Sequence, residues 1–137
     1  MTRDLAGVVS IALVLCTSGC TKPIQPSVVY PGLPFNLAPG RAVAIPDALT
    51  VTFDRVVSDS RCPTDVTCIA AGDAVVHLIV AGPASRVERE LHTASADTSK
   101  TTVDTYTIHL IDLTPYPRST RVIPPTDYTV TLQITSP

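Results

Sequence analysis

The stretch Tyr128-Thr129-Val130-Thr131-Leu132-Gln133-Ile134-Thr135 alternates apolar and polar side chains along its whole length. Successive side chains of a β-strand point to opposite faces, so this pattern predicts a strand with one buried face and one wet face. Residues 49–54 alternate in the same way, with Leu49, Val51 and Phe53 as the apolar set. β-Branched residues are abundant in both segments, which favours strands over helices.

Four further apolar segments predict strands. Residues 74–81 are nearly all apolar, which is typical of a central strand covered on both faces, and residues 106–113 behave similarly, with Val103 expected at the start of that strand. Residues 42–45 and 86–93 predict weaker strands. Segments rich in Pro, Gly or polar residues separate these runs and predict turns, at residues 38–40, 82–83, 95–102 and 114–117.

The pattern of segments predicts an all-β fold. No segment shows a convincing helical stripe, and strands do not alternate with helices as in βαβ units. Roughly six to eight short strands predict an antiparallel β-sandwich, immunoglobulin-like as the first choice, or a small barrel. The chain lacks tryptophan, and its cysteines are too close together for the Cys-Trp-Cys arrangement of antibody domains. Its 137 residues suit one domain, which we expect at residues 28–137.

A short apolar segment, residues 5–16, follows a charged start and leads to Thr17-Ser18-Gly19-Cys20. As a helix it would cover roughly 18 Å, short of the roughly 30 Å hydrocarbon core, so it predicts a signal peptide at residues 1–19 and not a membrane span. Small residues followed by cysteine resemble the lipobox of bacterial lipoproteins, and the resemblance implies cleavage before Cys20 and lipidation of Cys20. Thr17 stands where the lipobox usually has leucine, and ordinary secretion is the alternative.

This leader predicts an exported protein that is lipid-anchored to the cell envelope. Several acyl chains on Cys20 would hold the protein firmly on a membrane. Thr21 stands where an aspartate often retains such lipoproteins at the inner membrane, so the outer membrane is expected if the source has one. Residues 20–27 are expected to form a proline-containing tether between the lipid and the domain.

Cys62 and Cys68 predict a disulfide, since Cys16 leaves with the leader and Cys20 is the anchor. Their spacing matches neither a metal-binding knuckle with further ligands nor the Cys-x-x-Cys of redox proteins. In the chain-entropy model a loop of this size contributes roughly 2 to 2.5 kcal/mol. The bridge is therefore expected to shape a loop more than to hold the fold.

One motif stands out between two predicted strands: Ser58-Asp59-Ser60-Arg61-Cys62-Pro63, followed by Cys68-Ile69 and Ala71-Gly72. The motif resembles that of a family of uncharacterised bacterial exported proteins and lipoproteins with Asp-Ser-Arg-Cys-Pro, a short gap, then Cys, a hydrophobic residue, Trp, Ala and Gly. Ala70 stands where that family commonly has tryptophan. The resemblance implies a shared envelope β-domain and no established activity.

The motif has two interpretations. Asp59 can accept hydrogen bonds from nearby backbone N–H groups, Arg61 can form a bidentate carboxylate pair, and Pro63 stiffens the turn, which together favour a self-stabilised connection between strands. The alternative is a rigid recognition loop formed by Asp59, Arg61, Pro63 and Asp65, because preorganised loops lose less entropy on binding.

The remaining polar residues carry no recognisable chemistry. Charge is nearly balanced, at −2 overall, so nothing suggests a nucleic-acid partner. No cofactor or metal is expected, because the histidines lie in predicted strands outside any ligand motif, and no Gly-x-Ser-x-Gly elbow is present. The acidic residues around the motif are expected to be solvated turn carboxylates and not calcium ligands. The histidines are His77, His92 and His109, and the acidic residues are Asp59, Asp65 and Asp73.

Together these features predict a non-catalytic binding or interaction module of the cell envelope, attached to a membrane through its anchor and with an envelope protein as its partner. Two alternatives are a small exported hydrolase or metal-binding enzyme, and a protease inhibitor that presents Arg61-Cys62-Pro63 on the Cys62–Cys68 loop. A β-domain is compatible with each of these functions.

Overall fold

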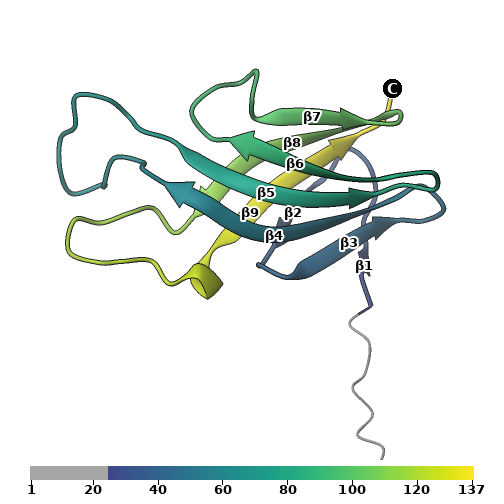
Figure 1. The fold of residues 1–137 in the computed structure, drawn as a ribbon, viewed down its shortest axis with the longest axis horizontal. Helices are drawn as coiled ribbons and strands as arrows, with labels where there is room; N and C mark the ends of the chain where they lie inside the picture. Colours follow the sequence, from purple (N-terminus) through teal and green to yellow (C-terminus); the bar gives the residue numbers. More distant parts are fainter. Residues whose placement is uncertain (1–24) are drawn as a thin grey trace, which may run out of the picture.

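The computed structural model describes residues 25–137, which form two β-sheets packed face to face (Figure 1). One sheet has the strand order β1-β3-β4-β5-β6, and the other has the order β2-β9-β8-β7. The signal peptide, Cys20 and most of the expected tether lie outside the described residues. The strands are β1 (Ser27–Val28), β2 (Pro34–Leu37), β3 (Arg41–Ile45), β4 (Leu49–Asp59), β5 (Ala74–Ala81), β6 (Arg86–His92), β7 (Lys100–Val103), β8 (Tyr106–Thr114) and β9 (Thr129–Thr135).

The prediction of an all-β sandwich is confirmed, and the two sheets do not close into a barrel. Consecutive strands from β3 to β6 pair as antiparallel neighbours, and so do β7, β8 and β9. β2 completes the second sheet beside β9, whereas β1 adds a short parallel edge beside β3. Immunoglobulin domains interleave strands from distant parts of the chain in each sheet, so the connectivity here is closer to a pair of meanders.

Alternating side chains of the two sheets fill the space between them. On the β4 and β5 side the core contains Val51 and Phe53 with Val76, Leu78 and Val80, all with no exposed surface. The strand β9 faces them with the apolar set of its alternating sequence, which is at most 1% exposed. Burial of these faces is the main stabilisation of the fold, at about 25 cal/mol per Å² of apolar surface removed from water.

The expected position of Val103 is wrong. Val103 does not begin the strand at residues 106–113 but ends a separate strand, β7, which occupies part of the predicted 95–102 loop. β7 and β8 form a hairpin through Asp104 and Thr105, and Asp104 has a left-handed φ of 54°. Aspartate tolerates that conformation, so the turn needs no glycine.

Two strands in the proline-rich N-terminal part were not expected. β1 has only two residues, and β2 begins at Pro34 on the edge of its sheet. Proline is accepted at the first residue of an edge strand, because its missing N–H removes no bond from the sheet interior. The single helical element of the described chain is the short 3₁₀ turn η1 (Pro125–Asp127).

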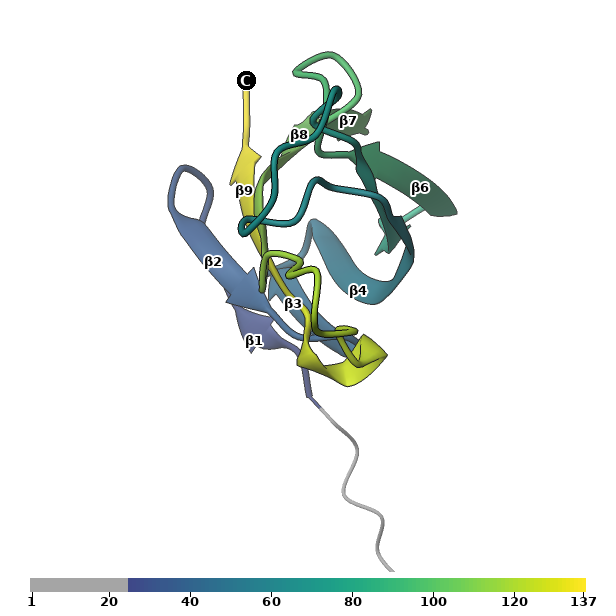
Figure 2. The ribbon, with the colours of Figure 1, turned by 90° about the vertical axis from the view of Figure 1, so that its left-hand side faces the viewer.

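Two long connections gather at one end of the sandwich, on the left of Figure 1. These are residues 60–73, between β4 and β5, and residues 115–124, between β8 and η1; together they are called the loop end below. Figure 2 looks onto this end. The start of the described chain and the C-terminus both lie towards the other side of the molecule. Residues 25–137 contain no helix with the length and apolarity needed to cross a bilayer.

Candidate functional site

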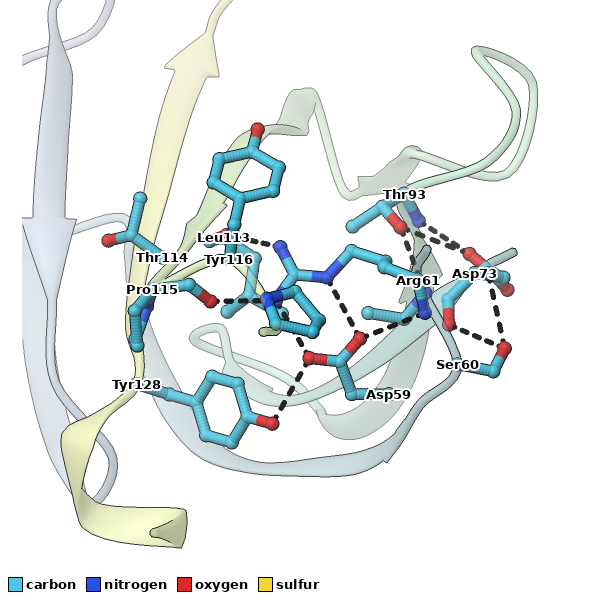
Figure 3. Close-up of polar contacts among 12 residues, drawn as sticks. Asp59, Ser60, Arg61, Asp73, Thr93, Leu113, Thr114, Pro115, Tyr116 and Tyr128 are labelled. Carbon is cyan, nitrogen blue, oxygen red and sulfur yellow. Dashed lines mark hydrogen bonds and ion pairs between the residues drawn. The ribbon is translucent and has the colours of Figure 1, made fainter. Parts of the chain in front are cut away.

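Arg61 and Asp59 form a buried bidentate ion pair at the loop end (Figure 3). Strand β4 ends at Asp59, and the guanidinium of Arg61 turns back to donate from Nε to Oδ1 at 2.9 Å and from Nη2 to Oδ2 at 2.7 Å. The backbone N–H of Arg61 donates to the same Oδ1 at 3.2 Å. Both side chains are only 8% exposed. The sequence-based expectation of a bidentate pair within this motif is therefore met.

The pair also connects the two sheets. Arg61 donates to the backbone carbonyl of Leu113 and, at 2.9 Å, to that of Pro115, where β8 ends. The Tyr128 hydroxyl, from the residue before β9, donates to Oδ2 of Asp59 at 3.1 Å. Arg61 thus links the end of β4 in one sheet to the end of β8 in the other. The planar guanidinium of arginine has five N–H donors and can bind several acceptors at once, which a lysine ammonium does less well.

Electrostatics at this pair favour the charged forms. Burial alone would raise the pKa of Asp59, but hydrogen bonds from Arg61, its charge and the Tyr128 hydroxyl hold that pKa below its ordinary value. Burial would lower the pKa of Arg61, but the hydrogen bonds and charge of Asp59 raise it. Burial and the neighbouring carboxylate raise the pKa of Tyr128. Asp59 is therefore a structural carboxylate, and its expected role as a solvated turn residue is wrong.

Asp73 is also engaged rather than freely solvated. Its Oδ1 accepts from the backbone N–H of Thr93 at 3.0 Å, and its Oδ2 lies 2.6 Å from Nδ1 of His92. Burial opposes ionisation, but these hydrogen bonds, those from Ala94 and the Thr93 hydroxyl, and the charge of His92 lower the pKa of Asp73. Ser60 bonds the backbone of Asp73, so the two sides of the 60–73 connection are joined where they leave the sheet.

The predicted Cys62–Cys68 disulfide is present and closes a small ring within residues 60–73. The ring rests on the neighbouring connection, because Asp65 accepts from both the backbone N–H and the hydroxyl of Ser119, at 2.9 and 2.7 Å. These bonds lower the pKa of Asp65, which is another carboxylate with a structural partner. Pro63 accepts a turn bond from the Val66 N–H within the ring.

Gly72 closes the connection after the ring. Its φ of +72° lies in the left-handed region, and a Cβ there would approach the Ser60 carbonyl oxygen to 1.9 Å. The backbone on either side of the connection can therefore meet only at a glycine. This gives a physical reason for the Gly of the sequence motif.

A cleft of about 300 Å³ opens between the two sheets at the loop end. Arg61 and Tyr116 form part of its wall, and the guanidinium carbon lies 4.9 Å from the centre of the Tyr116 ring. Asp112 accepts from the Tyr116 hydroxyl at 2.7 Å, and this bond and the negative charge raise the pKa of Tyr116. The remaining lining residues are Ala71, Gly72, Thr93, Ala94, Leu110 and Ile111.

Each histidine in the described part of the chain makes its own separate contacts. His77 is buried between Asp54 and Glu88, at 3.1 and 3.4 Å, on the outer side of its sheet. His109 lies 3.4 Å from the Thr135 hydroxyl. No histidine of residues 25–137 is hydrogen-bonded to a serine, and those residues include no group of three or more His, Cys, Asp or Glu side chains placed to hold a metal.

Sequence reasoning did not find Tyr128, Asp112 or the two backbone carbonyls as parts of this site. Each lies more than 50 residues from Asp59 and Arg61 in the sequence, so no local signal marks them. The motif residues that it did select, Asp59, Arg61, Pro63 and Asp65, all lie at the loop end, with the disulfide beside them. No protein-family model, curated protein or solved structure matches this chain.

Proposed function

We propose that this protein is a bacterial cell-envelope lipoprotein whose β-domain binds an envelope protein without catalysing a reaction. The loop end is the binding surface. The observation that carries the proposal is a contrast between charged and apolar side chains at that end. The charged groups of the motif bind to other groups of the same chain, while apolar side chains are exposed to solvent. Val66, Ile69 and Val122 are 45%, 110% and 90% exposed.

This arrangement favours recognition because the loop is already ordered before binding. The Asp59–Arg61 pair, the disulfide and the Asp65–Ser119 contacts fix the backbone, so a partner would meet a rigid surface at a small entropic cost. Exposed apolar side chains on a rigid scaffold are typical of protein-binding surfaces. Asp59, Arg61, Pro63 and Asp65 therefore act by shaping the binding loop.

The proposed location is based on the leader. The resemblance of residues 17–20 to a lipobox supports lipidation of Cys20, and the similarity of the Asp59–Gly72 motif to exported lipoproteins supports an envelope address. A mature chain that begins at Cys20 would place the domain beside a membrane, after a short tether. If the source has two membranes, Thr21 favours the outer one.

The geometry does not favour the two alternative functions. An inhibitor that presents Arg61 as bait needs that side chain in solvent, whereas Arg61 is 8% exposed and bound to Asp59. A serine hydrolase needs its nucleophile next to a base, and residues 25–137 include no histidine bonded to a serine.

Intact-mass analysis of the protein from its native membrane tests the anchor. The expected species begins at Cys20 and carries acyl mass, and a Cys20→Ala variant lacks that mass. Reduction adds about two mass units for the Cys62–Cys68 bridge. A soluble, unacylated native product would contradict the proposed anchoring while leaving the binding surface to be tested separately.

Photocrosslinking in intact envelopes tests the binding surface. A photoreactive residue replaces Ile69 at the loop end or Leu33, which is 69% exposed between β1 and β2. The expected result is one specific protein adduct from position 69 that is absent from position 33 and lost in an Arg61→Ala variant. Equal labelling from both positions, or no protein adduct from position 69, would overturn the proposal.

A further inference from the structure

The two lateral sides of the sandwich differ in charge. Each sheet has two edge strands, and Figure 2 shows β1 and β2 together on one side and β6 and β7 together on the other. The side formed by β1, β2 and the turn between them is called the β1–β2 side below. It includes no charged side chain, and neither does any other position of residues 23–40. The charged side chains of the opposite edge strands are Arg86, Glu88, Arg89, Glu90 and Lys100.

The β1–β2 side also exposes large apolar side chains. Val28, Tyr30 and Leu33 are 57%, 71% and 69% exposed. The turn that carries them is fixed against β9, because the Gly32 N–H donates to a carbonyl of that strand at 2.8 Å. The Gly32 carbonyl in turn accepts from the side chain of Gln133 at 2.7 Å. Strand edges that face only water are commonly protected by charged side chains, so an uncharged edge with exposed apolar groups indicates contact with an apolar phase.

The lipid anchor proposed at Cys20 lies close to this side in the sequence. Gln25 follows Cys20 by five residues, and an extended chain spans at most about 3.6 Å per residue, so the two lie within about 18 Å of each other. The strand β1 begins two residues later, at Ser27. The strand β6 is four strand spacings from β1, each about 4.8 Å. A lipid on Cys20 therefore holds the β1–β2 side closer to the bilayer than the charged side.

From these observations we infer that the β1–β2 side lies on the membrane surface, with Val28, Tyr30 and Leu33 in the interfacial layer of the bilayer. The inference rests on the proposed lipid anchor and names the orientation in which the anchored domain is held. Tyrosine suits this layer, because its ring is apolar and its hydroxyl can bond to water and headgroups. Charged side chains are costly to bring into lipid, and this side has none. The charged side then faces water.

Photolabelling of the acylated full chain tests this inference. The protein is purified from its native membrane, its acyl mass is verified, and it is placed in vesicles of phosphatidylethanolamine and phosphatidylglycerol. A photoreactive residue replaces Leu33 on the β1–β2 side or Glu90 on the charged side, both of which are exposed. The expected result is the added mass of one phospholipid from position 33 and no lipid adduct from position 90.

Tyr30→Asp and Tyr30→Phe are the matched variants, because both replace an exposed side chain and leave the turn contacts of Gly32 in place. The aspartate would bring a charge to the interfacial layer and is expected to remove most of the lipid adduct from position 33. The phenylalanine keeps the aromatic ring and is expected to retain that adduct.

The outcomes separate this inference from the proposed function. Equal lipid labelling of the acylated chain from positions 33 and 90, or none from position 33, would overturn the inference and leave the proposed function standing. An adduct between two copies of this chain from position 33 would also overturn the inference alone, since this side would then be an interface between copies. A native chain without acyl mass would overturn the anchor and this inference with it, while position 69 would still test the binding surface.

Discussion

The guanidinium of Arg61 lies over the Tyr116 ring, with 4.9 Å between its central carbon and the ring centre, while its nitrogens hold Asp59 on the other side. One side chain therefore joins the end of β4, the end of β8 and an aromatic wall of the cleft. A cation that stacks on a ring and pairs with a carboxylate at the same time needs the planar shape of arginine.

Replacement of Arg61 by alanine is expected to lower the free energy of unfolding by about 3 kcal/mol, because it leaves the buried carboxylate of Asp59 without its counterion. Arg61→Lys restores the charge but not the bidentate geometry and is expected to recover less than half of the loss. Urea denaturation with the disulfide intact measures both. Arg55→Ala is the control, since Arg55 is 59% exposed, and should change stability by at most about 0.5 kcal/mol.

Low pH should weaken the ion pair between Asp59 and Arg61. The pKa of Asp59 in the folded protein is lower than the unfolded value of about 3.9, so its ionised form stabilises the fold above that value, and the stabilisation is lost as pH falls through the lower folded pKa. Compared with wild type, Asp59→Asn is therefore expected to show its full loss of stability above about pH 5 and a shrinking loss below about pH 4. Urea denaturation between pH 2 and pH 7 measures the difference, and a loss that stays constant over this range would contradict the role of the charge.

Gly72 and Gly40 provide a matched pair for the backbone at the loop end. Both have a left-handed φ, +72° and +74°, but a Cβ at Gly40 meets nothing within 4 Å, whereas at Gly72 it would meet Ser60. Gly40→Ala is expected to cost about 1 kcal/mol of stability for the conformation alone. Gly72→Ala should cost about 2 kcal/mol more, because the backbone must move to admit the methyl group. Equal losses in thermal or urea unfolding would show that the close approach to Ser60 is unimportant.

The Cys62–Cys68 disulfide should stabilise the 60–73 connection more than the rest of the fold. Cys62→Ala/Cys68→Ala is expected to lower the free energy of unfolding by about 2 kcal/mol, the loop entropy of a ring of this size, while the sandwich remains folded. Hydrogen exchange locates the effect: the amide of Thr64, which donates to Pro117, and that of Ser119, which donates to Asp65, should exchange faster. Amides of β5, such as Leu78, should keep their protection relative to the new global stability. Global loss of the sheets would instead make the bridge essential to the fold.

Strand prediction from the sequence succeeded where side chains alternate or are uniformly apolar. Residues 74–81 form β5 with the predicted bounds, and β9 begins one residue after the predicted Tyr128. It failed at β7, because the two-residue turn at Asp104 carries neither glycine nor proline to mark it. It also failed at β2, where Pro34 masks an edge strand whose partner, β9, lies about a hundred residues later.

Only the contact between neighbouring residues of the motif could be predicted from the sequence. Asp59 and Arg61 are two residues apart, so their pairing follows from the chemistry of the side chains. Their remaining contacts come from residues 52 to 69 positions away, and those depend on how the two sheets pack. For the same reason the sequence could not show that Arg61 is buried, which is the fact that separates a structural arginine from an exposed bait.

Two residues that secure the 60–73 connection stand outside the disulfide ring: Arg61 precedes Cys62, and Gly72 follows Cys68. Inside the ring, Thr64 and Asp65 bond to Pro117 and Ser119 of the neighbouring connection, whereas Val66 is exposed. Exposed positions of the ring can therefore vary in sequence, and so change what the loop recognises, without loss of the contacts that hold the fold. The same property would make it a site for grafting foreign peptide epitopes onto the domain.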